Sequence, residues 1–383
     1  MACLAFGSSL CNLVFKGVIL MKMSLIRLCR VVVMLTLALF LSACDNPKTP
    51  SKSVESLTQS TDYVFEPVVK GNKLQFPKDY GSHPEYRAEW WYFTTNLESE
   101  SGKQIALQWT LFRMATGDEE TKGWKTPQMY MAHAVITTKK KTWRAERFAR
   151  GGIGQAGVIL SPFRAWLDNW TWRSKDSSPF PGRLEFADDN MKAILDITQE
   201  GSIVLQGDNG YSRKHPLLDI ASYYYSAPFL NVKGTLELDG ETYRVKGQGW
   251  FDREWSSSML SLQQQGWDWF SIHLDDGSAL MVSQLREHGE KPYFFGSRSW
   301  KNGKVVKLDN HQIRMKPIKY FFVKGKQFPL IWEIEIPSQS IKIETTAVRR
   351  EQWLPFIFPY WEGPIRVTGS HKGKGFMELT GYE

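Results

Sequence analysis

Apolar residues recur at every second position along most of the chain after residue 63, whereas runs with helical spacing are scarce. Residues 104–113 show the pattern most clearly, because every odd position from 105 to 111 is apolar. The same alternation occurs in residues 235–238, 332–336 and 341–345. A period of two places successive side chains on opposite faces of a strand, so these segments are predicted to be β-strands.

Turn-forming dipeptides separate the alternating segments, among them Asp239-Gly240, Asp276-Gly277 and Asn302-Gly303. Asp-Gly and Asn-Gly are typical of the tight hairpins that join antiparallel neighbours. The pattern therefore predicts an antiparallel, all-β chain.

Part of this strand pattern occurs twice. Residues 90–97, with the strand that follows them to Arg113, resemble residues 267–274 with the strand that follows to Arg286. In both stretches a Trp-rich strand comes first and a Gly lies in the turn before the second strand.

A later pair of segments extends the repeat, because residues 232–234 with Gly249-Trp250 resemble residues 367–369 with Gly381-Tyr382. Two copies of one β-unit are therefore predicted, and closure of each copy as a barrel would remove its exposed strand edges. The predicted domains are an N-terminal and a C-terminal unit, residues 63–255 and 256–383.

The first 44 residues have the features of an export signal. Lys22, Arg27 and Arg30 precede eleven mostly apolar residues, 31–41. Eleven residues are too few to cross a bilayer core, which takes about 20. A basic start, a short apolar run and small residues before a cleavage site are instead typical of a signal peptide. An uncleaved apolar N-terminal helix is the alternative.

The run Leu41-Ser42-Ala43-Cys44 resembles the lipobox of bacterial lipoproteins, in which the Cys receives lipid and becomes the new N-terminus. The resemblance implies that residues 1–43 are removed and that lipid on Cys44 holds the chain at a membrane of the cell envelope. In a Gram-negative cell, Asp45 would retain it at the inner membrane. Residues 44–62 are polar and rich in Ser, Thr and Pro, which predicts a flexible tether.

The composition of the mature chain argues against several kinds of site and partner. All four Cys lie within the first 44 residues, so cleavage and lipidation leave no thiol for disulfides, metal binding or catalysis. Loss of four of the 48 basic residues and none of the 40 acidic ones lowers the net charge from +8 to +4. Such a charge does not favour nucleic acid as a partner, because that function usually needs a clustered basic face.

All 16 Trp lie from Trp90 onward. They either build the core or line a site for a flat or apolar ligand.

Six motifs occur in order along the folded part of the chain: His83-Pro84, Glu89-Trp90-Trp91-Tyr92, Phe112-Arg113, Tyr130-Met131-Ala132-His133, Trp250-Phe251-Asp252-Arg253-Glu254-Trp255 and Tyr360-Trp361-Glu362-Gly363-Pro364. Together they resemble the AttH-type family, whose relatives include the carotenoid 1,2-hydratases (hydroxyneurosporene synthases). The resemblance implies two tandem lipocalin-like antiparallel β-barrels packed together, in agreement with the repeat. It implies the fold more firmly than a reaction, because many members are labelled only as secreted hydrolases.

The segment 250–255 is the strongest candidate for chemistry. On a strand, Trp250, Asp252 and Glu254 share one face, and burial together with a neighbouring carboxylate raises a carboxyl pKa. A protonated acid in an apolar cavity can protonate a C=C bond, after which water captures the cation. Alternatively, both acids lie at a rim and form salt bridges with Arg253 or other arginines. The hydratases carry a His where Arg253 stands, so the chain departs from their pattern here.

Asp268 is a third candidate proton donor. It lies between Trp267 and Trp269, at the position that Trp91 occupies in the first repeat. An acid in an aromatic strand indicates a selected polar group, unless Asp268 faces outward while both Trp neighbours face the core.

Buried arginines near Trp commonly close one end of lipocalin-like barrels, and we expect Arg113 near Trp90 to do so. A buried Arg must be paired, and Glu89 is its expected partner. His133 either lines a cavity or is a hydrogen-bonded core residue. The predicted ligand-binding residues are Glu89, Trp90, Tyr92, Gln108, Arg113, His133, Trp250, Trp255, Trp267 and Arg286.

No cofactor and no metal are predicted, because no two His residues have the spacing of a metal site. A Gly-x-Ser-x-Gly elbow is missing, so the hydrolase label has no serine nucleophile behind it. Three functions stay open. The first is a membrane-anchored lipoprotein that binds a hydrophobic or polyene-like small molecule in a Trp-rich barrel cavity. The second is a hydratase or cyclase with Asp252, Glu254 or Asp268 as proton donor. The third is a structural or partner-binding lipoprotein.

Overall fold

The computed structural model describes residues 64–118 and 121–382. The predicted signal peptide, the tether and Cys44 lie outside the described residues. Within that part of the chain, no helix has the length and hydropathy needed to cross a bilayer. The helical elements there are short 3-10 turns: η1 (Lys78–Tyr80), η2 (Gly123–Lys125), η3 (Asn310–Gln312) and η4 (Pro337–Gln339).

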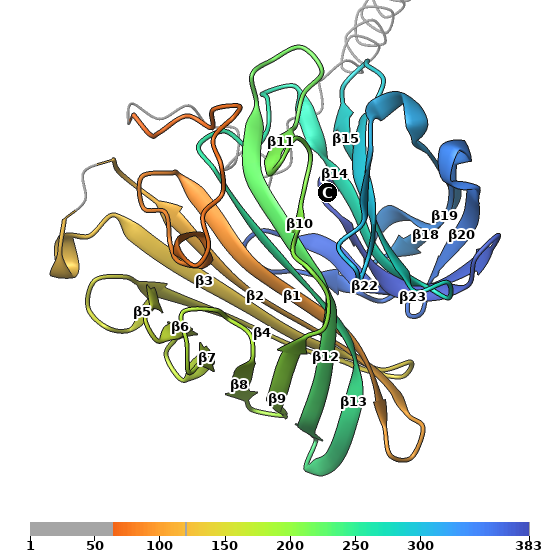
Figure 1. Cartoon of the computed structure of the whole chain (residues 1–383). Coiled ribbons are helices and arrows are strands. Elements are labelled where there is room, and N and C mark those ends of the chain that lie inside the picture. Colours follow the sequence, from red (N-terminus) through yellow and green to blue (C-terminus); the bar gives the residue numbers. More distant parts are fainter. Residues whose placement is uncertain (1–63, 119–120, 383) are drawn as a thin grey trace, which may run out of the picture. The chain divides into compact units, whose positions relative to one another are not determined.

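The first half of the described chain forms one antiparallel sheet (Figure 1). Its strands lie in the spatial order β4 (Thr142–Arg150), β3 (Gln128–Thr137), β2 (Gln104–Ala115), β1 (Ala88–Ser99), β13 (Glu241–Ser256), β12 (Ala221–Leu238), β9 (Met191–Gln199), β8 (Gly182–Asp188), β7 (Trp170–Ser174), β6 (Phe163–Leu167) and β5 (Ala156–Leu160), while β10 (Val204–Leu205) and β11 (Tyr211–Arg213) pair with β12. The sheet curls until β6 contacts β2, β3 and β4, which makes it a near-barrel.

The second half forms another antiparallel sheet, coiled into a half-barrel. Its strands lie in the spatial order β17 (Val305–Leu308), β16 (Tyr293–Trp300), β15 (Ser278–Glu287), β14 (Gln264–Leu274), β23 (Gly373–Leu379), β22 (Tyr360–Gly369), β20 (Ile341–Ala347), β19 (Lys326–Ile336) and β18 (Arg314–Val323), while β21 (Trp353–Leu354) pairs with β22. The predicted all-β architecture of two packed antiparallel units is confirmed.

The two sheets repeat one topology. The strand β1 lies between β2 and β13, just as β14 lies between β15 and β23, and β12 and β22 follow at equivalent places. The strand pairing corrects one part of the predicted repeat. Val232 pairs with Gly247, and Val367 pairs with Gly373. Gly249 is therefore equivalent to Gly375 and not to Gly381, because the hairpin between β22 and β23 is shorter than the one between β12 and β13.

Strand alternation assigns the side chains to three apolar layers. Odd positions of β1 and β13 fill the near-barrel, where large rings such as Trp91, Trp109 and Trp172 are fully buried. Even positions of β14 fill the half-barrel together with Trp332 and its neighbours. The opposite faces of these strands meet between the two sheets in a third cluster, which includes Tyr92. Many of the Trp residues are thus core.

Candidate active site

A cavity of about 150 Å³ lies between the two sheets. One wall comes from β1, β2, β3, β12 and β13 of the near-barrel, and the other from β14, β15, β16, β22 and β23 of the half-barrel. The prediction of a cavity inside a barrel is therefore wrong in its location, because aromatic side chains pack the near-barrel interior. The volume corresponds to about one aromatic ring.

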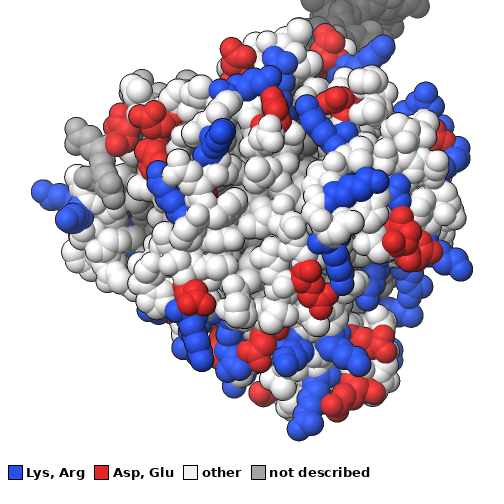
Figure 2. Space-filling model, in the orientation of Figure 1, with Lys and Arg blue, Asp and Glu red and all other residues white. Residues whose placement is uncertain are grey.

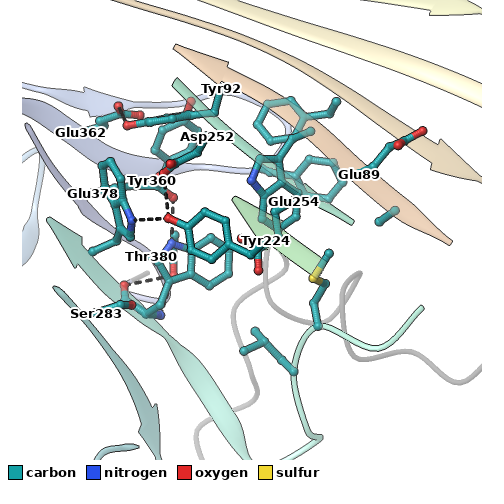
Figure 3. Close-up of a pocket in the computed structure, with 18 of the residues that line it drawn as sticks. Glu89, Tyr92, Tyr224, Asp252, Glu254, Ser283, Tyr360, Glu362, Glu378 and Thr380 are labelled. Carbon is teal, nitrogen blue, oxygen red and sulfur yellow. Dashed lines mark hydrogen bonds between the residues drawn. The ribbon is translucent and has the colours of Figure 1, made fainter. Parts of the chain in front are cut away.

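The strand β13 presents its even positions to this cavity, as its alternation predicts. Asp252 and Glu254 line the cavity, and Trp250 is buried on the same face among residues of both sheets. Arg253 and Trp255 point the other way, into the near-barrel. Figure 3 shows the acids of β13 and of the second sheet gathered around the cavity.

Asp252 is held by three neutral donors. Tyr224 donates to Oδ2 at 2.8 Å, while Ser226 and the indole of Trp250 donate to Oδ1 at 2.5 and 2.7 Å. Burial raises the pKa of Asp252 from 3.8 to about 7, although these three hydrogen bonds oppose the shift. Asp252 can therefore hold or release a proton near neutral pH, which is what a general acid needs.

Glu378 is the counterpart of Asp252 in the second sheet, and the sequence analysis missed it. Asp252 pairs across the ladder with Tyr92, and Glu378 pairs with Trp269, whose position in the repeat matches that of Tyr92. Burial also raises the pKa of Glu378 to about 7, and the indole of Trp267 donates to it at 2.9 Å. The mistaken match of Gly249 with Gly381 hid this equivalence.

Glu362 is a further acid in the cavity wall, and it lies in the motif Tyr360-Trp361-Glu362-Gly363-Pro364, whose pattern alone predicts no role for it. Tyr92 donates its hydroxyl hydrogen to Glu362 and so joins β1 to β22. Burial holds the pKa of Glu362 well above its usual range, and Glu378 raises it further. Both effects favour the protonated form of Glu362.

A polar chain runs from the cavity to the surface through His133. Tyr360 lines the cavity. Its hydroxyl oxygen accepts from the side-chain amide of Gln108 at 2.8 Å and lies 2.8 Å from Nδ1 of His133. His133 Nε2 lies 3.1 Å from Glu146, which is partly exposed. Burial lowers the pKa of His133, so we assign it as neutral, with Nε2 donating to Glu146 and Nδ1 accepting from Tyr360. Gln108 does not line the cavity itself, but it hydrogen-bonds Tyr360 and Glu362, which do.

Glu254 forms an ion pair with a residue that no sequence motif singles out. Lys214, on the loop between β11 and β12, lies 2.6 Å from Glu254, and Ser222 also donates to this carboxylate. The cation that pairs with Glu254 is thus Lys214 and not Arg253. Among the residues that the structure describes, no group of three His, Cys, Asp or Glu side chains is placed to hold a metal ion.

A buried ion cluster closes one end of the near-barrel. Glu89 accepts from Arg113, as predicted, and also from Arg253 and from the backbone N–H of His83. Burial alone would raise the pKa of Glu89, but the two guanidinium groups outweigh it and hold this pKa well below its usual range. Arg253 lies over the ring of Trp91 at 3.8 Å, so the aromatic partner of this cluster is not Trp90.

Trp90, together with parts of Glu89 and Arg113, borders the cavity. Trp255 does not, because it stacks on His83 inside the near-barrel with ring centres 4.0 Å apart.

The second sheet contains an equivalent but simpler cluster. Asp268 accepts from Gln284 at 2.6 Å and from Arg286 at 3.1 Å, and it is fully buried. Burial raises the pKa of Asp268 and Arg286 opposes the rise. Trp267 and Trp269 line the cavity on the opposite face of β14. Asp268 thus lies inside the half-barrel, where it neither faces outward nor reaches the cavity.

Comparison with known proteins finds relatives along almost all of the described chain. The model of the AttH-like family matches residues 67–382. A crystal structure from Nitrosomonas europaea, described as an AttH, is 32% identical with a TM-score of 0.74, and the match covers 83% of this chain and 99% of that one.

Two more distant structures share the fold. Kievitone hydratase from Nectria haematococca is 13% identical with a TM-score of 0.63, and the match covers 85% of this chain and 98% of that one. CghA, solved with Sch210972, is 12% identical with a TM-score of 0.51, covering 84% and 96%. A search of curated proteins gives no significant match.

Proposed function

The chain belongs to the AttH-like family, and from this membership and the chemistry of the cavity we propose that it is an enzyme that protonates a C=C bond of an apolar small molecule. The observation that carries the proposal is the pair Asp252 and Glu378. They face one cavity from equivalent strands, and each has a pKa of about 7. One of the two can therefore be protonated while the other is ionised.

The proposed reaction begins when the carboxyl hydrogen of Asp252 passes to one alkene carbon. The π electrons form the new C–H bond, which leaves a cation on the other carbon and a carboxylate on Asp252. Water then forms a C–O bond to the cation, and the resulting oxonium gives its extra proton to the carboxylate of Glu378. Transfer of one proton from Glu378 back to Asp252 restores the starting enzyme. The sum is addition of one water molecule, with the enzyme unchanged. Attack by a second double bond in place of water would close a ring.

The aromatic wall favours a positively charged intermediate. Trp90, Phe112, Trp267 and Trp269 line the cavity, and the faces of such rings attract cations. A cavity the size of one ring holds only the reacting part of an isoprenoid-like molecule, so the rest of a longer substrate would extend beyond it.

The first test uses whatever apolar ligand the protein retains from its own host, identified by native mass spectrometry. Incubation of that ligand with the protein in water enriched in oxygen-18 should give a product that carries one heavy oxygen atom. A rearranged product without heavy oxygen would indicate cyclisation. A ligand that stays unchanged would contradict the enzyme and favour the carrier, and a ligand-free protein would favour the structural role.

We also propose that lipid on Cys44 anchors the chain in the cell envelope, because its surroundings resemble a lipobox. Cells fed a labelled fatty acid should incorporate the label into the parent chain and into Cys29→Ala, whose substitution lies inside the predicted signal peptide. The variant Cys44→Ala should carry no label. Equal labelling of the two variants would rule out Cys44 as the lipidated residue.

A further inference from the structure

Three exposed leucines lie on loops beside the cavity, and we call them the Leu rim. Leu217 and Leu218 lie on the loop between β11 and β12 and are 84% and 45% exposed, and Leu262, on the linker between β13 and β14, is 65% exposed. Burial of apolar side chains is favourable, and exposed leucines that lie on joined loops can mark a surface that another apolar phase covers.

Hydrogen bonds hold the loops of the Leu rim together. Gln264 donates its side-chain amide to the carbonyl of Lys214 at 2.8 Å, which joins the linker to the β11–β12 loop. His215 Nδ1 accepts from the backbone N–H groups of Leu217 and Leu218 at 3.0 and 2.9 Å. The other ring nitrogen of His215 lies 3.1 Å from Glu287. These hydrogen bonds therefore fix the conformation of the loops that carry the leucines.

The same loops form part of the cavity wall. Lys214 precedes Leu217 on its loop, and Met259 and Leu260 precede Leu262 on the linker, and all three line the cavity. An apolar phase that covers the Leu rim would therefore lie next to the cavity.

The described chain begins near the start of the linker that carries Leu262. Ser257, at the start of the linker, donates its hydroxyl hydrogen to the carbonyl of Glu66 at 2.6 Å, and the nearby Val64 is 83% exposed. Cys44 precedes Val64 by 20 residues. Twenty residues can extend over at most about 70 Å. Lipid on Cys44 would keep the Leu rim within reach of the bilayer.

Charges around the Leu rim are of both signs. The exposed Arg213, at the end of β11, and Asp219, on the loop that follows it, are of opposite charge, and so are the exposed Glu290 and Lys291 on the loop between β15 and β16. Figure 2 shows blue and red side chains mixed over the loops at the top of the view, where Figure 1 places the loop that follows β11. Contact with a bilayer would therefore depend on apolar insertion more than on attraction to anionic lipids.

We propose that the Leu rim inserts into the surface of the bilayer that carries the Cys44 lipid, so that an apolar substrate passes from the bilayer into the cavity. This inference rests on the proposed function and on the lipid anchor. It identifies the substrate class as molecules dissolved in the membrane.

The test places a fluorescent label at a single position of the lipidated chain. The mature chain has no other free thiol, so Leu217→Cys, Leu262→Cys and the control Val305→Cys can each be labelled selectively. Val305, 40% exposed, pairs with Ser299 at the end of the second sheet away from the linker. Each protein is incorporated into phosphatidylcholine vesicles that contain a lipid-attached quencher.

Labels at positions 217 and 262 should be quenched severalfold more than the label at 305, with little change when salt is added. Quenching at 217 and 262 no stronger than at 305 would overturn the inference, and so would failure of all three proteins to stay on the vesicles. Strong quenching at the Leu rim in a protein that converts no ligand would contradict the proposed reaction and leave the docking surface intact.

Discussion

The substitution Asp252→Asn is expected to lower turnover of the retained ligand at least about a hundredfold, because a positioned general acid contributes that much or more. Asn has nearly the same shape and can still accept from Ser226 and Trp250, but it has no acidic proton to give. The measurement is the rate of product formation under single-turnover conditions. Glu378→Gln is the matched variant, and the one that abolishes protonation identifies the donor.

The same substitution should make the folded chain more stable at pH 8. Because burial raises the pKa of Asp252 from 3.8 to about 7, the folded chain binds this proton more tightly than the unfolded chain. The stability that this bound proton provides is complete below about pH 4 and is lost as the pH rises through about 7. A shift of about three pH units corresponds to roughly 4 kcal/mol.

Urea unfolding of parent and variant between pH 4 and pH 8, followed by tryptophan fluorescence, measures this difference. The parent should lose stability over that range, and Asp252→Asn should lose less. If neither Asp252→Asn nor Glu378→Gln slows the reaction, the assignment of the proton donor is wrong. If the stability of Asp252→Asn depends on pH as strongly as that of the parent, the raised pKa of Asp252 is wrong, whatever the chain catalyses.

The largest loss of stability is expected for Glu89→Ala. Glu89 is the carboxylate between Arg113 and Arg253, and its removal leaves two guanidinium groups inside the near-barrel without their counter-ion. Breaking a buried ion pair in this way typically costs about 3–5 kcal/mol. Denaturant unfolding of both chains at pH 7 would measure the fall in the free energy of unfolding.

The control is Asp208→Asn, which breaks an exposed pair with Lys70 and should leave stability unchanged within error. A Glu89→Ala variant as stable as the parent would show that water reaches the cluster or that other groups compensate the two arginines. Replacement of Glu89 and both arginines by apolar residues of similar size should recover much of the loss, because the cost lies in the uncompensated charge.

The strands could be predicted from the sequence because alternation is a local property. Residues 104–113 lie in β2, residues 332–336 in β19 and residues 341–345 in β20. The shared face of Asp252 and Glu254 followed from the same rule. The pairing of Glu89 with Arg113 was predictable too, since a buried Arg requires a partner.

The position of the cavity was not predictable, because it depends on how two sheets pack and not on the pattern within either. Lys214 gave no signal, since it lies on a loop far in sequence from Glu254. Glu378 was predictable in principle. Gly249-Trp250 resembles two later pairs, Gly375-Phe376 and Gly381-Tyr382, and only the match with the first pair aligns Glu378 with Asp252. Alignment by strand register would have matched Glu378 to Asp252.

The equivalence of Asp252 and Glu378 has a consequence for how such a site could arise. A symmetric dimer of one ancestral half would have placed two identical acids across its twofold axis, with identical affinity for a proton. Fusion of the halves into one gene frees each copy to diverge, and here Asp252 keeps three hydrogen-bond donors while Glu378 receives a hydrogen bond from Trp267. Such a duplication would let two equivalent positions acquire different surroundings, as the proposed passage of a proton between two carboxyl groups requires.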